Sequence, residues 1–274
     1  MTTAGEAIRA AAERLAPVSD TARLDAELLM AHLFGVSRSE LLLRHMRDPV
    51  PPGFAALIER RMGHEPVAYI TGRQEFYGLP FMVTPTTLIP RGDSETLVEA
   101  ALAAKPDALR VLDLGTGSGA LLLAVLAYLG KAQGIGIDRS EPALDVARAN
   151  AEALGLRPQA RFVAGDWHAA GWTEDLGTFD LILCNPPYVE ADAALDAQVR
   201  DFEPHTALFA GPEGLDDYRV LIPQLRALMN EGAVAVLEIG ANQADAVAAL
   251  AGAAGFTTRL HRDLAGRARA LVLG

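Results

Sequence analysis

The sequence predicts an α/β protein with a doubly wound, mostly parallel, seven-stranded Rossmann-like sheet, preceded by a small N-terminal helical bundle and a β-hairpin linker. Three observations favour this fold. From Arg110 onward, apolar runs of strand length such as "RVLDLG" and "FDLILCN" alternate with helical patterns. Runs that are apolar on both faces are typical of parallel strands covered by helices on each side. The first 70 residues instead repeat apolar residues every three or four positions, which indicates helices.

Residues 1–72 are predicted to form the helical domain. Apolar residues recur at helical spacing in four stretches of this part of the chain. Gly35 is the expected end of the second helix, because glycine suits helix C-termini. Ser37 or Ser39 is the expected start of the third, because serine caps N-termini. The four predicted helices cover residues 4–16, 21–35, 37–45 and 51–66.

A short hairpin is predicted between two domains, over residues 73–90. The stretch around it, "VAYITGRQEFYGLPFMVTPTTLIP", is rich in aromatic and β-branched residues and is interrupted by glycine and proline. The second domain is expected to cover residues 91–274. It should begin with a helix over residues 91–104 that is capped by Asp93 or Ser94.

The strands and helices of the second domain alternate, which requires right-handed crossovers between parallel neighbours. A doubly wound sheet places the carboxyl ends of these strands along one edge, where ligands bind. Strands are predicted over residues 110–115, 134–138, 160–167, 179–185, 233–240, 256–263 and 268–274. Helices are predicted over residues 119–130, 141–155, 216–229 and 241–255.

The charge of the chain argues against nucleic acid as a partner. The formal net charge is −11, from 24 basic and 35 acidic residues. Residues 76–274 carry 15 of the basic and 25 of the acidic ones. Because binding to nucleic-acid phosphates depends on a basic surface, a cationic ligand or a basic protein partner suits this chain better.

Cysteine content and hydropathy predict a cytoplasmic protein with no membrane partner. Cys184 is the single cysteine, so an internal disulfide is impossible, as is usual in a reducing compartment. The N-terminal stretch contains Glu6 and Glu13 and lacks the apolar core of a signal peptide. The longest apolar run, residues 120–130, is shorter than the roughly 20 residues that span a bilayer.

A nucleotide-type cofactor site is predicted where the first strand turns into its helix. Gly115, Gly117 and Gly119 in "VLDLGTGSGA" allow a sharp turn and a close approach to a ligand. Asp138 ends the second strand, where a carboxylate can accept hydrogen bonds from both ribose hydroxyls. The spacing also satisfies a dinucleotide fingerprint, so a nicotinamide dinucleotide and S-adenosylmethionine compete. Asp113 favours S-adenosylmethionine, because a carboxylate there suits a methionine amino group better than a pyrophosphate.

The third strand is followed by residues that suit an adenine. Asp166 can accept a hydrogen bond from the exocyclic amine, and Trp167 offers an aromatic face for stacking. His168 is expected to be a solvent-facing neighbour rather than a catalytic base.

The turn after the fourth strand, Asn185-Pro186-Pro187-Tyr188, predicts the reaction type. A planar nitrogen can attack a methyl sulfonium when its N–H groups are held so that its lone pair points at the methyl carbon. The Asn185 side-chain oxygen and the Pro186 carbonyl are the two acceptors, and successive prolines hold the backbone rigid. Tyr188 can stack on the substrate group or exclude water. Cys184 is expected to pack in the core, and no histidine spacing indicates a metal site.

These motifs and several longer stretches resemble the N(5)-glutamine methyltransferases that modify peptide chain release factors. The resemblance covers essentially the whole chain and rests most selectively on "ITGRQEFYGLPF" and "EPHTALFAGPEGL". The Asn-Pro-Pro-Tyr turn is less selective, because enzymes that methylate DNA adenine and RNA guanine share it. The resemblance implies a Rossmann-like methyltransferase sheet and a helical domain that docks the substrate. It also implies methylation of the glutamine in the Gly-Gly-Gln loop of class 1 release factors.

The resemblance implies roles for individual residues. The turn from Asn185 to Tyr188 would bind the glutamine side chain, with Asn185, Pro186 and Tyr188 acting in catalysis. Arg91 and Glu95 would lie beside the substrate. The residue after the arginine is glycine where the family commonly has proline, so this loop is expected to be more flexible. S-adenosylmethionine would leave as S-adenosylhomocysteine, with no metal. Taken with the motifs, its expected contacts are Asp113, Gly115, Thr116, Gly117, Ser118, Gly119, Asp138, Asp166, Trp167 and Asn185.

Four other functions are compatible with these residues. A glutamine methyltransferase that acts on a ribosomal protein would share almost every motif. A nucleic-acid amino-methyltransferase would need a basic recognition surface, whereas residues 1–75 carry 9 basic and 10 acidic residues. A nicotinamide-dependent dehydrogenase would share the Gly-rich loop, and a non-enzymatic binding module would share the fold.

Overall fold

The computed structural model describes residues 2–274. The chain folds as two compact units. The first contains the N-terminal part up to Arg73 together with Leu195–Phe202, and the second contains Gln74–Ala194 and Glu203–Gly274. The predicted linker therefore belongs almost entirely to the second unit. A short segment from within the predicted second domain belongs to the first.

The first unit is a bundle of short helices around an apolar core of its own. Gly35 has a left-handed backbone (φ +68°) and ends its helix, as predicted. Ser37 caps the next helix, because its hydroxyl accepts a hydrogen bond from the Glu40 N–H at 3.1 Å. The core includes Ile8, Leu15, Leu29, Met30, Leu41 and Ile58. The helices are α1 (Ala4–Leu15), α2 (Ala22–Phe34), α3 (Arg38–Glu40), the π-helix η1 (Leu41–His45), α4 (Phe54–Met62), α5 (Val67–Thr71) and α9 (Ala197–Phe202).

Two segments of this unit differ from the prediction. Residues 67–71 form the helix α5, which lies within the predicted helical domain but beyond its four predicted helices. Pro66 leads into α5 and Gly72 ends it with a left-handed backbone, so local start and stop signals outweigh β propensity. The third predicted helix is divided, because its second half is the π-helical turn η1.

The second unit contains one hairpin and one seven-stranded sheet. The strand order is β5-β4-β3-β6-β7-β9-β8; β9 runs antiparallel to both neighbours and the other pairs are parallel. This order confirms the predicted doubly wound, mostly parallel fold. The hairpin strands are β1 (Arg73–Phe76) and β2 (Leu79–Met82). The sheet strands are β3 (Arg110–Leu114), β4 (Gln133–Asp138), β5 (Ala160–Ala164), β6 (Phe179–Cys184), β7 (Met229–Glu238), β8 (Thr258–Arg262) and β9 (Ala268–Leu273).

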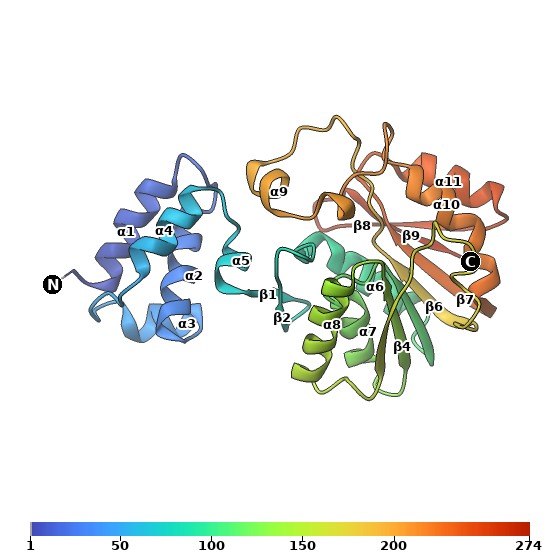
Figure 1. Cartoon of the computed structure of the whole chain (residues 1–274), viewed down its shortest axis with the longest axis horizontal. Helices are drawn as coiled ribbons and strands as arrows, with labels where there is room; N and C mark the ends of the chain where they lie inside the picture. The colour runs from blue at the N-terminus through green and yellow to red at the C-terminus, as the bar shows by residue number, and fades with distance from the viewer. Residues whose placement is uncertain (1) are drawn as a thin grey trace. The chain divides into compact units, whose positions relative to one another are not determined.

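Helices cover both faces of this sheet (Figure 1). Alternate residues of β6 pack on opposite faces, with Leu183 in one core cluster and Cys184 in the other. Cys184 is buried, as predicted, and burial raises the pKa of its thiol. One face carries α6 (Glu95–Ala104), α7 (Ala120–Tyr128) and α8 (Glu141–Ala153), and the other carries α10 (Asp216–Leu225) and α11 (Ala244–Ala253).

The start of α6 differs from the predicted cap. Gly92–Ser94 forms a 3-10 turn that leads into the helix, and Ser94 has a helical backbone and makes no capping hydrogen bond. The Asp93 carboxylate pairs instead with Arg267 and Arg269. Because the turn continues directly into the helix, neither side chain is placed to cap it.

Four strand ends meet at one edge of the sheet. β3 lies between β4 and β6, so the direction in which strands are added reverses beside β3, and such a switch point opens a crevice. Leu114 pairs with Ile137 and Cys184, and Cys184 pairs with Leu237. The residues that directly follow these four positions are Gly115, Asp138, Asn185 and Glu238.

Candidate functional site

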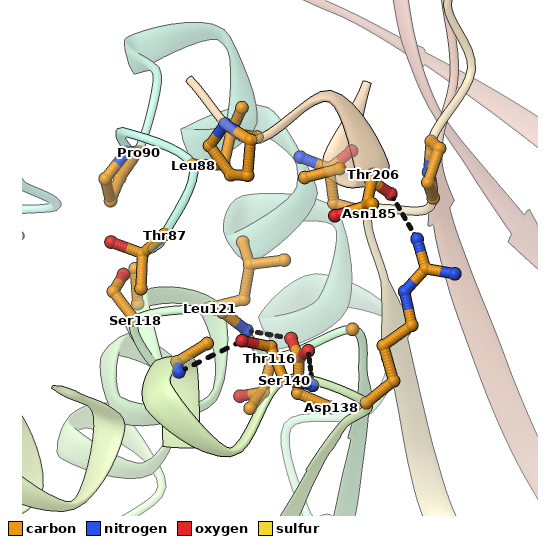
Figure 2. A pocket seen from close by; sticks show the side chains of 18 of the residues that line it. Thr87, Leu88, Pro90, Thr116, Ser118, Leu121, Asp138, Ser140, Asn185 and Thr206 are labelled. Atoms are coloured by element: carbon orange, nitrogen blue, oxygen red, sulfur yellow. Dashed lines mark hydrogen bonds between the residues drawn. The ribbon is translucent and has the colours of Figure 1, made fainter. Parts of the chain in front are cut away.

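A cavity of about 280 Å³ lies at the carboxyl edge of β3, β4, β5 and β6. Figure 2 shows Thr116 from the loop after β3, Asp138 from the end of β4 and Asn185 from the turn after β6 around this cavity. Two further segments, one before α6 and one after α9, add to its lining. They contribute Thr86, Thr87, Leu88, Pro90 and Arg91, and Pro204, Thr206 and Ala207.

The Gly-rich loop brings its backbone to the cavity wall. Gly115 and Gly117 have φ values of +73° and +53°, which glycine adopts without strain. A β-carbon on Gly115 would lie 3.2 Å from the Trp167 ring. Gly119 does not line the cavity; a β-carbon there would lie 3.1 Å from the Leu123 side chain, so this glycine serves the packing of α7. The loop residues that line the cavity are Gly115, Thr116, Gly117 and Ser118.

Asp138 faces the cavity with each carboxylate oxygen engaged once. Its Oδ2 accepts a hydrogen bond from the Gly117 N–H, and its Oδ1 accepts one from the Ser140 N–H, both at 2.9 Å (Figure 2). A carboxylate oxygen can accept a second hydrogen bond. The carboxylate is therefore held in place by the backbone and retains acceptor capacity for two hydroxyl groups.

Asp113 lies at the end of β3 and does not line the cavity. Its Oδ2 accepts a hydrogen bond from the Thr116 hydroxyl at 2.6 Å. Its Oδ1 is buried and has no hydrogen-bond partner among residues 2–274. Burial raises the pKa of Asp113 to about 7, although the Thr116 hydrogen bond acts in the opposite direction. A contact between Asp113 and a methionine amino group stays a prediction. The unpartnered Oδ1 is the kind of acceptor that such an amino group needs.

Asp166 and Trp167 both line the cavity, as the adenine prediction requires. Trp167 is half-buried, and its Nε1–H donates a hydrogen bond to Asp217 at 2.8 Å. The His168 side chain is 45% exposed, which agrees with the predicted solvent-facing position. Its Nε2 also lies 3.0 Å from the Asp217 carboxylate. The structure thus adds Asp217 as a partner of both aromatic rings.

The Asn-Pro-Pro-Tyr turn presents alternate residues to the cavity. Asn185 and Pro187 line it, whereas Pro186 and Tyr188 do not. The Tyr188 hydroxyl donates a hydrogen bond to Glu238 at 3.1 Å. Burial and then the Glu238 charge raise the pKa of Tyr188, so the phenol remains a donor. Stacking of Tyr188 on a substrate stays a prediction.

Glu238 at the end of β7 and Gln243 beyond it hold this turn in place. Glu238 is buried, one of its carboxylate oxygens has no partner within the described chain, and burial raises the pKa of its carboxyl. The Tyr218 hydroxyl donates a hydrogen bond to the Glu238 carbonyl at 2.6 Å. Gln243 donates one to the Tyr188 carbonyl at 3.0 Å and accepts one from the Gly240 N–H at 3.0 Å. Both ends of Tyr188 are therefore fixed.

The rim of the cavity is joined by two long-range contacts. Arg91 donates a hydrogen bond to Glu203, a buried carboxylate that also accepts one from the Ile89 N–H at 3.2 Å. Arg139 donates one to the Thr206 carbonyl at 2.7 Å (Figure 2). These contacts tie the segment before α6 and the end of β4 to the segment that contains η3 (His205–Ala207).

Glu95 is placed differently from Arg91. It does not line the cavity, and its carboxylate accepts a hydrogen bond from the Tyr77 N–H at 2.9 Å in the hairpin turn. A substrate contact for Glu95 stays a prediction, as does the extra flexibility expected from Gly92. Arg91 is the member of this predicted pair that lines the cavity.

Residues 2–274 contain neither a clustered metal-ligand set nor a membrane-spanning helix. No group of three or more histidine, cysteine, aspartate or glutamate side chains in this range is arranged to hold a metal ion. No helix in the same range is both long enough and apolar enough to cross a bilayer.

The sequence patterns did not identify Arg139, Glu203, Asp217 or Glu238 as part of the site. Glu203 opens "EPHTALFAGPEGL", a stretch that carried the family resemblance without assigned roles, and Asp217 follows two positions after its end. Glu238 has a clearer signal, because it is a carboxylate at the end of the apolar strand "AVAVLE". Charged residues in such positions are seldom buried without a function or a partner.

Comparisons with known proteins cover both units. Residues 6–72 match the family model of the PrmC N-terminal domain, and residues 105–246 match that of a methyltransferase domain. A release factor glutamine methyltransferase from Cereibacter sphaeroides is 44% identical over 97% of this chain and 96% of its own length. One from Rhodospirillum rubrum is 44% identical over 91% of this chain and 78% of its own.

Solved structures agree on the fold. A methyltransferase from Pyrococcus furiosus has a TM-score of 0.52 and 17% identity, over 72% of this chain and 89% of that chain. At this identity the similarity shows the fold alone, which is the Rossmann-like methyltransferase sheet predicted from the sequence.

Proposed function

Because the chain belongs to the release factor glutamine methyltransferase family, we propose that it methylates the side-chain amide nitrogen of the glutamine in the Gly-Gly-Gln motif of class 1 peptide chain release factors, with S-adenosylmethionine as methyl donor. One observation supports the reaction type: Asn185, Asp138 and Trp167 line the same cavity. The near full-length similarity to the curated relatives supports the substrate. A substrate that acts in translation, together with the single cysteine, favours the cytoplasm.

The residues of the cavity fit S-adenosylmethionine. Asp138 has acceptor capacity left for the two ribose hydroxyls, and Trp167 offers an aromatic face for the adenine. The Oδ1 of Asp113 has no hydrogen-bond partner among the described residues, and a cationic amino group would satisfy it. When bound, S-adenosylmethionine supplies an electrophilic methyl group on its sulfonium.

The chain's own contribution to the reaction is to orient the glutamine amide. The Asn185 side-chain oxygen and the Pro186 carbonyl would accept the two N–H hydrogen bonds and turn the nitrogen lone pair toward the methyl group. The nitrogen–carbon bond forms as the carbon–sulfur bond breaks, and the excess proton then leaves the nitrogen for water. Positioning of this kind can supply on the order of 7–11 kcal/mol in favourable cases, so no strong base is needed.

The helical unit is proposed to dock the protein substrate. Residues 6–72 match a family model of their own, which supports a role specific to this family. The acidic charge of the chain suits a protein rather than a nucleic-acid partner. Removal of residues 1–72 should raise KM for the intact release factor more than for a Gly-Gly-Gln peptide. Equal increases in KM would contradict docking.

The proposed function is tested by mass spectrometry of two candidate substrates, a class 1 release factor and the ribosomal protein that the sister enzymes modify. Each is incubated with S-adenosylmethionine and the full chain, and the added methyl group is located by fragmentation. We expect one methyl group on the Gly-Gly-Gln glutamine of the release factor. Methylation of the ribosomal protein alone would overturn the proposed substrate but retain the proposed reaction.

A further inference from the structure

The Trp167 indole forms a wall of the cavity, and its Nε1–H donates a hydrogen bond to Asp217 at 2.8 Å. At the other end of the ring, Cη2 lies so close to Gly115 that a β-carbon there would be only 3.2 Å away. The indole is therefore held between a carboxylate at its pyrrole edge and the Gly-rich loop at its benzene edge.

Asp217 is itself fixed by the fold. It is the second residue of α10, it is buried, and it stands 50 positions from Trp167 in the sequence. An acidic residue in the first turn of a helix is favoured by the helix dipole. The Trp167 carbonyl is held as well, because it accepts a hydrogen bond from Gln224 of the same helix at 3.1 Å. One helix thus anchors both the side chain and the backbone of Trp167.

This inference rests on the proposed use of S-adenosylmethionine. We propose that Asp217 is a positioning residue for cofactor binding, which holds the Trp167 indole as a rigid wall over the Gly-rich loop. Without this acceptor, the indole N–H loses its charged partner and the ring gains freedom to leave the cavity wall. An aromatic face held in place in the free protein loses less entropy when a ligand stacks on it.

His168 shares the acceptor but has a different place in this arrangement. Its Nε2 lies 3.0 Å from the same Asp217 oxygen, and its side chain is 45% exposed and does not line the cavity. Removing His168 leaves the indole hydrogen bond intact. Cofactor binding should therefore depend on Asp217 and Trp167, and hardly on His168.

The test measures binding of S-adenosylhomocysteine to the full chain by calorimetry, without any turnover. Asp217→Ala should weaken binding roughly tenfold, the order expected for loss of one hydrogen bond to a charged acceptor. Asp217→Asn keeps an acceptor oxygen and should stay within about threefold of the wild type. Asp217→Ser serves as a second variant that suits a first helical turn, but its hydroxyl is too short to reach the indole.

The matched control is Asp216→Ala. Asp216 is also an acid in the first turn of α10, but it is exposed and pairs with Arg219 rather than with an aromatic ring. Its removal costs the same helix-dipole interaction and should change the dissociation constant by less than about twofold. His168→Ala should change it equally little. A tenfold effect of either control would overturn the specific role of Asp217.

A double-mutant cycle identifies the route of the effect. In a Trp167→Phe background no indole N–H remains, so Asp217→Ala should produce no further loss of affinity. Fluorescence supplies a second readout: Trp172, the other tryptophan of the chain, is replaced by phenylalanine, and the emission of Trp167 is followed. Asp217→Ala should shift this emission toward that of a solvated indole, whereas Asp216→Ala should not.

The outcomes separate this inference from the proposed function. If the wild type does not bind S-adenosylhomocysteine, the proposed function fails and this inference fails with it. If the wild type binds it and methylates a release factor, but Asp217→Ala binds equally well, only this inference is wrong. It is also wrong if Asp217→Ala weakens binding as much in the Trp167→Phe background as in the wild type.

Discussion

The Gly-rich loop after β3 takes its shape from nearby residues, whereas the Asn-Pro-Pro-Tyr turn after β6 is held by residues about 50 positions away. In the loop, Thr116 bonds to Asp113 three positions before it, and Gly117 bonds to Asp138 at the end of the next strand, 21 positions on. In the turn, Tyr188 is held by Glu238 and by Gln243, which are 50 and 55 positions away.

The site therefore has two halves. The local half is the Gly-rich loop with Asp113 and Asp138, and the tertiary half is the Asn-Pro-Pro-Tyr turn with Glu238 and Gln243. A change at the end of β7 should leave the Gly-rich loop and its ligand nearly unaffected, because the hydrogen bonds of the loop go to Asp113 and Asp138. A change at the end of β7 should disturb the turn, although β7 contributes no residue to the cavity lining. The cofactor and the reacting amide are therefore expected to respond to different sets of substitutions.

Asn185→Ala should have the largest effect and should separate the two halves most clearly. Removing one preorganised polar group at a reacting centre costs roughly 100- to 1000-fold in turnover. Single-turnover methylation of a release factor should slow by this factor, while the dissociation constant of S-adenosylhomocysteine changes by less than about fivefold. Unchanged turnover would remove Asn185 from the reaction, and an equal loss in affinity would place it in the cofactor half.

Asp113→Asn tests the local half through stability. The folded-state pKa of Asp113 is raised from 3.8 to about 7, so the folded state holds a proton that the unfolded state has lost. Stability should therefore fall as pH rises from about 4 toward 7 and level off above that value. Between pH 5 and pH 8, titration of Asp113 should lower the free energy of unfolding of the wild type by on the order of 2–3 kcal/mol.

The measurement is urea denaturation of the ligand-free wild type and of Asp113→Asn at pH 5 and pH 8. Asp113→Asn has no titrating group at this position. The difference between its free energies of unfolding at pH 5 and pH 8 should therefore be smaller than that of the wild type by about 2–3 kcal/mol. Thr116→Val, which removes only the hydroxyl bonded to Asp113, is the matched control, and it should raise the pKa further. Identical pH dependence in the wild type and in Asp113→Asn would contradict the raised pKa.

Asp138→Ala should weaken S-adenosylhomocysteine binding roughly tenfold or more, because it removes the acceptor for the ribose and the partner of two backbone N–H groups. Turnover at saturating cofactor should fall much less. Calorimetry and saturation kinetics separate the two quantities. Asp138→Asn, with one acceptor oxygen left, should lie between the wild type and the alanine variant. An unchanged dissociation constant would exclude the ribose role.

Tyr188→Phe and Glu238→Ala should have the smallest effect, about three- to fivefold each on turnover, since one hydrogen bond is worth about 1 kcal/mol. The double variant should be no slower than the singles, because both remove the same interaction. Glu238→Gln keeps an acceptor and should resemble the wild type. Affinity for S-adenosylhomocysteine should not change in any of them. Additive effects in the double variant would mean that Glu238 does not act through Tyr188.

Sequence patterns predicted most of the fold correctly. The predictions that failed concern segments where local and tertiary signals compete. The strands of the sheet and the helices that cover it were predicted because their apolar periodicity is strong. The helix at residues 67–71 was not predicted because their β propensity conflicted with the flanking Pro66 and Gly72. The predicted cap of α6 failed because Asp93 pairs with Arg267, just before β9, and with Arg269 in β9, contacts that no local pattern reveals.

The sequence by itself determined the backbone motifs of the site: a glycine loop, a carboxylate at the end of the next strand, and a proline-stiffened turn. Each is short and contiguous, so its conformation follows from the φ preferences of glycine and proline and from hydrogen bonds to near neighbours. Only the tertiary structure decided which side chains hold these motifs in place. The carboxylates of Glu203, Asp217 and Glu238 reach partners 50 to 114 positions away. Such pairs exist only after the sheet and its helices have assembled, since burial then makes a partner necessary for each polar group.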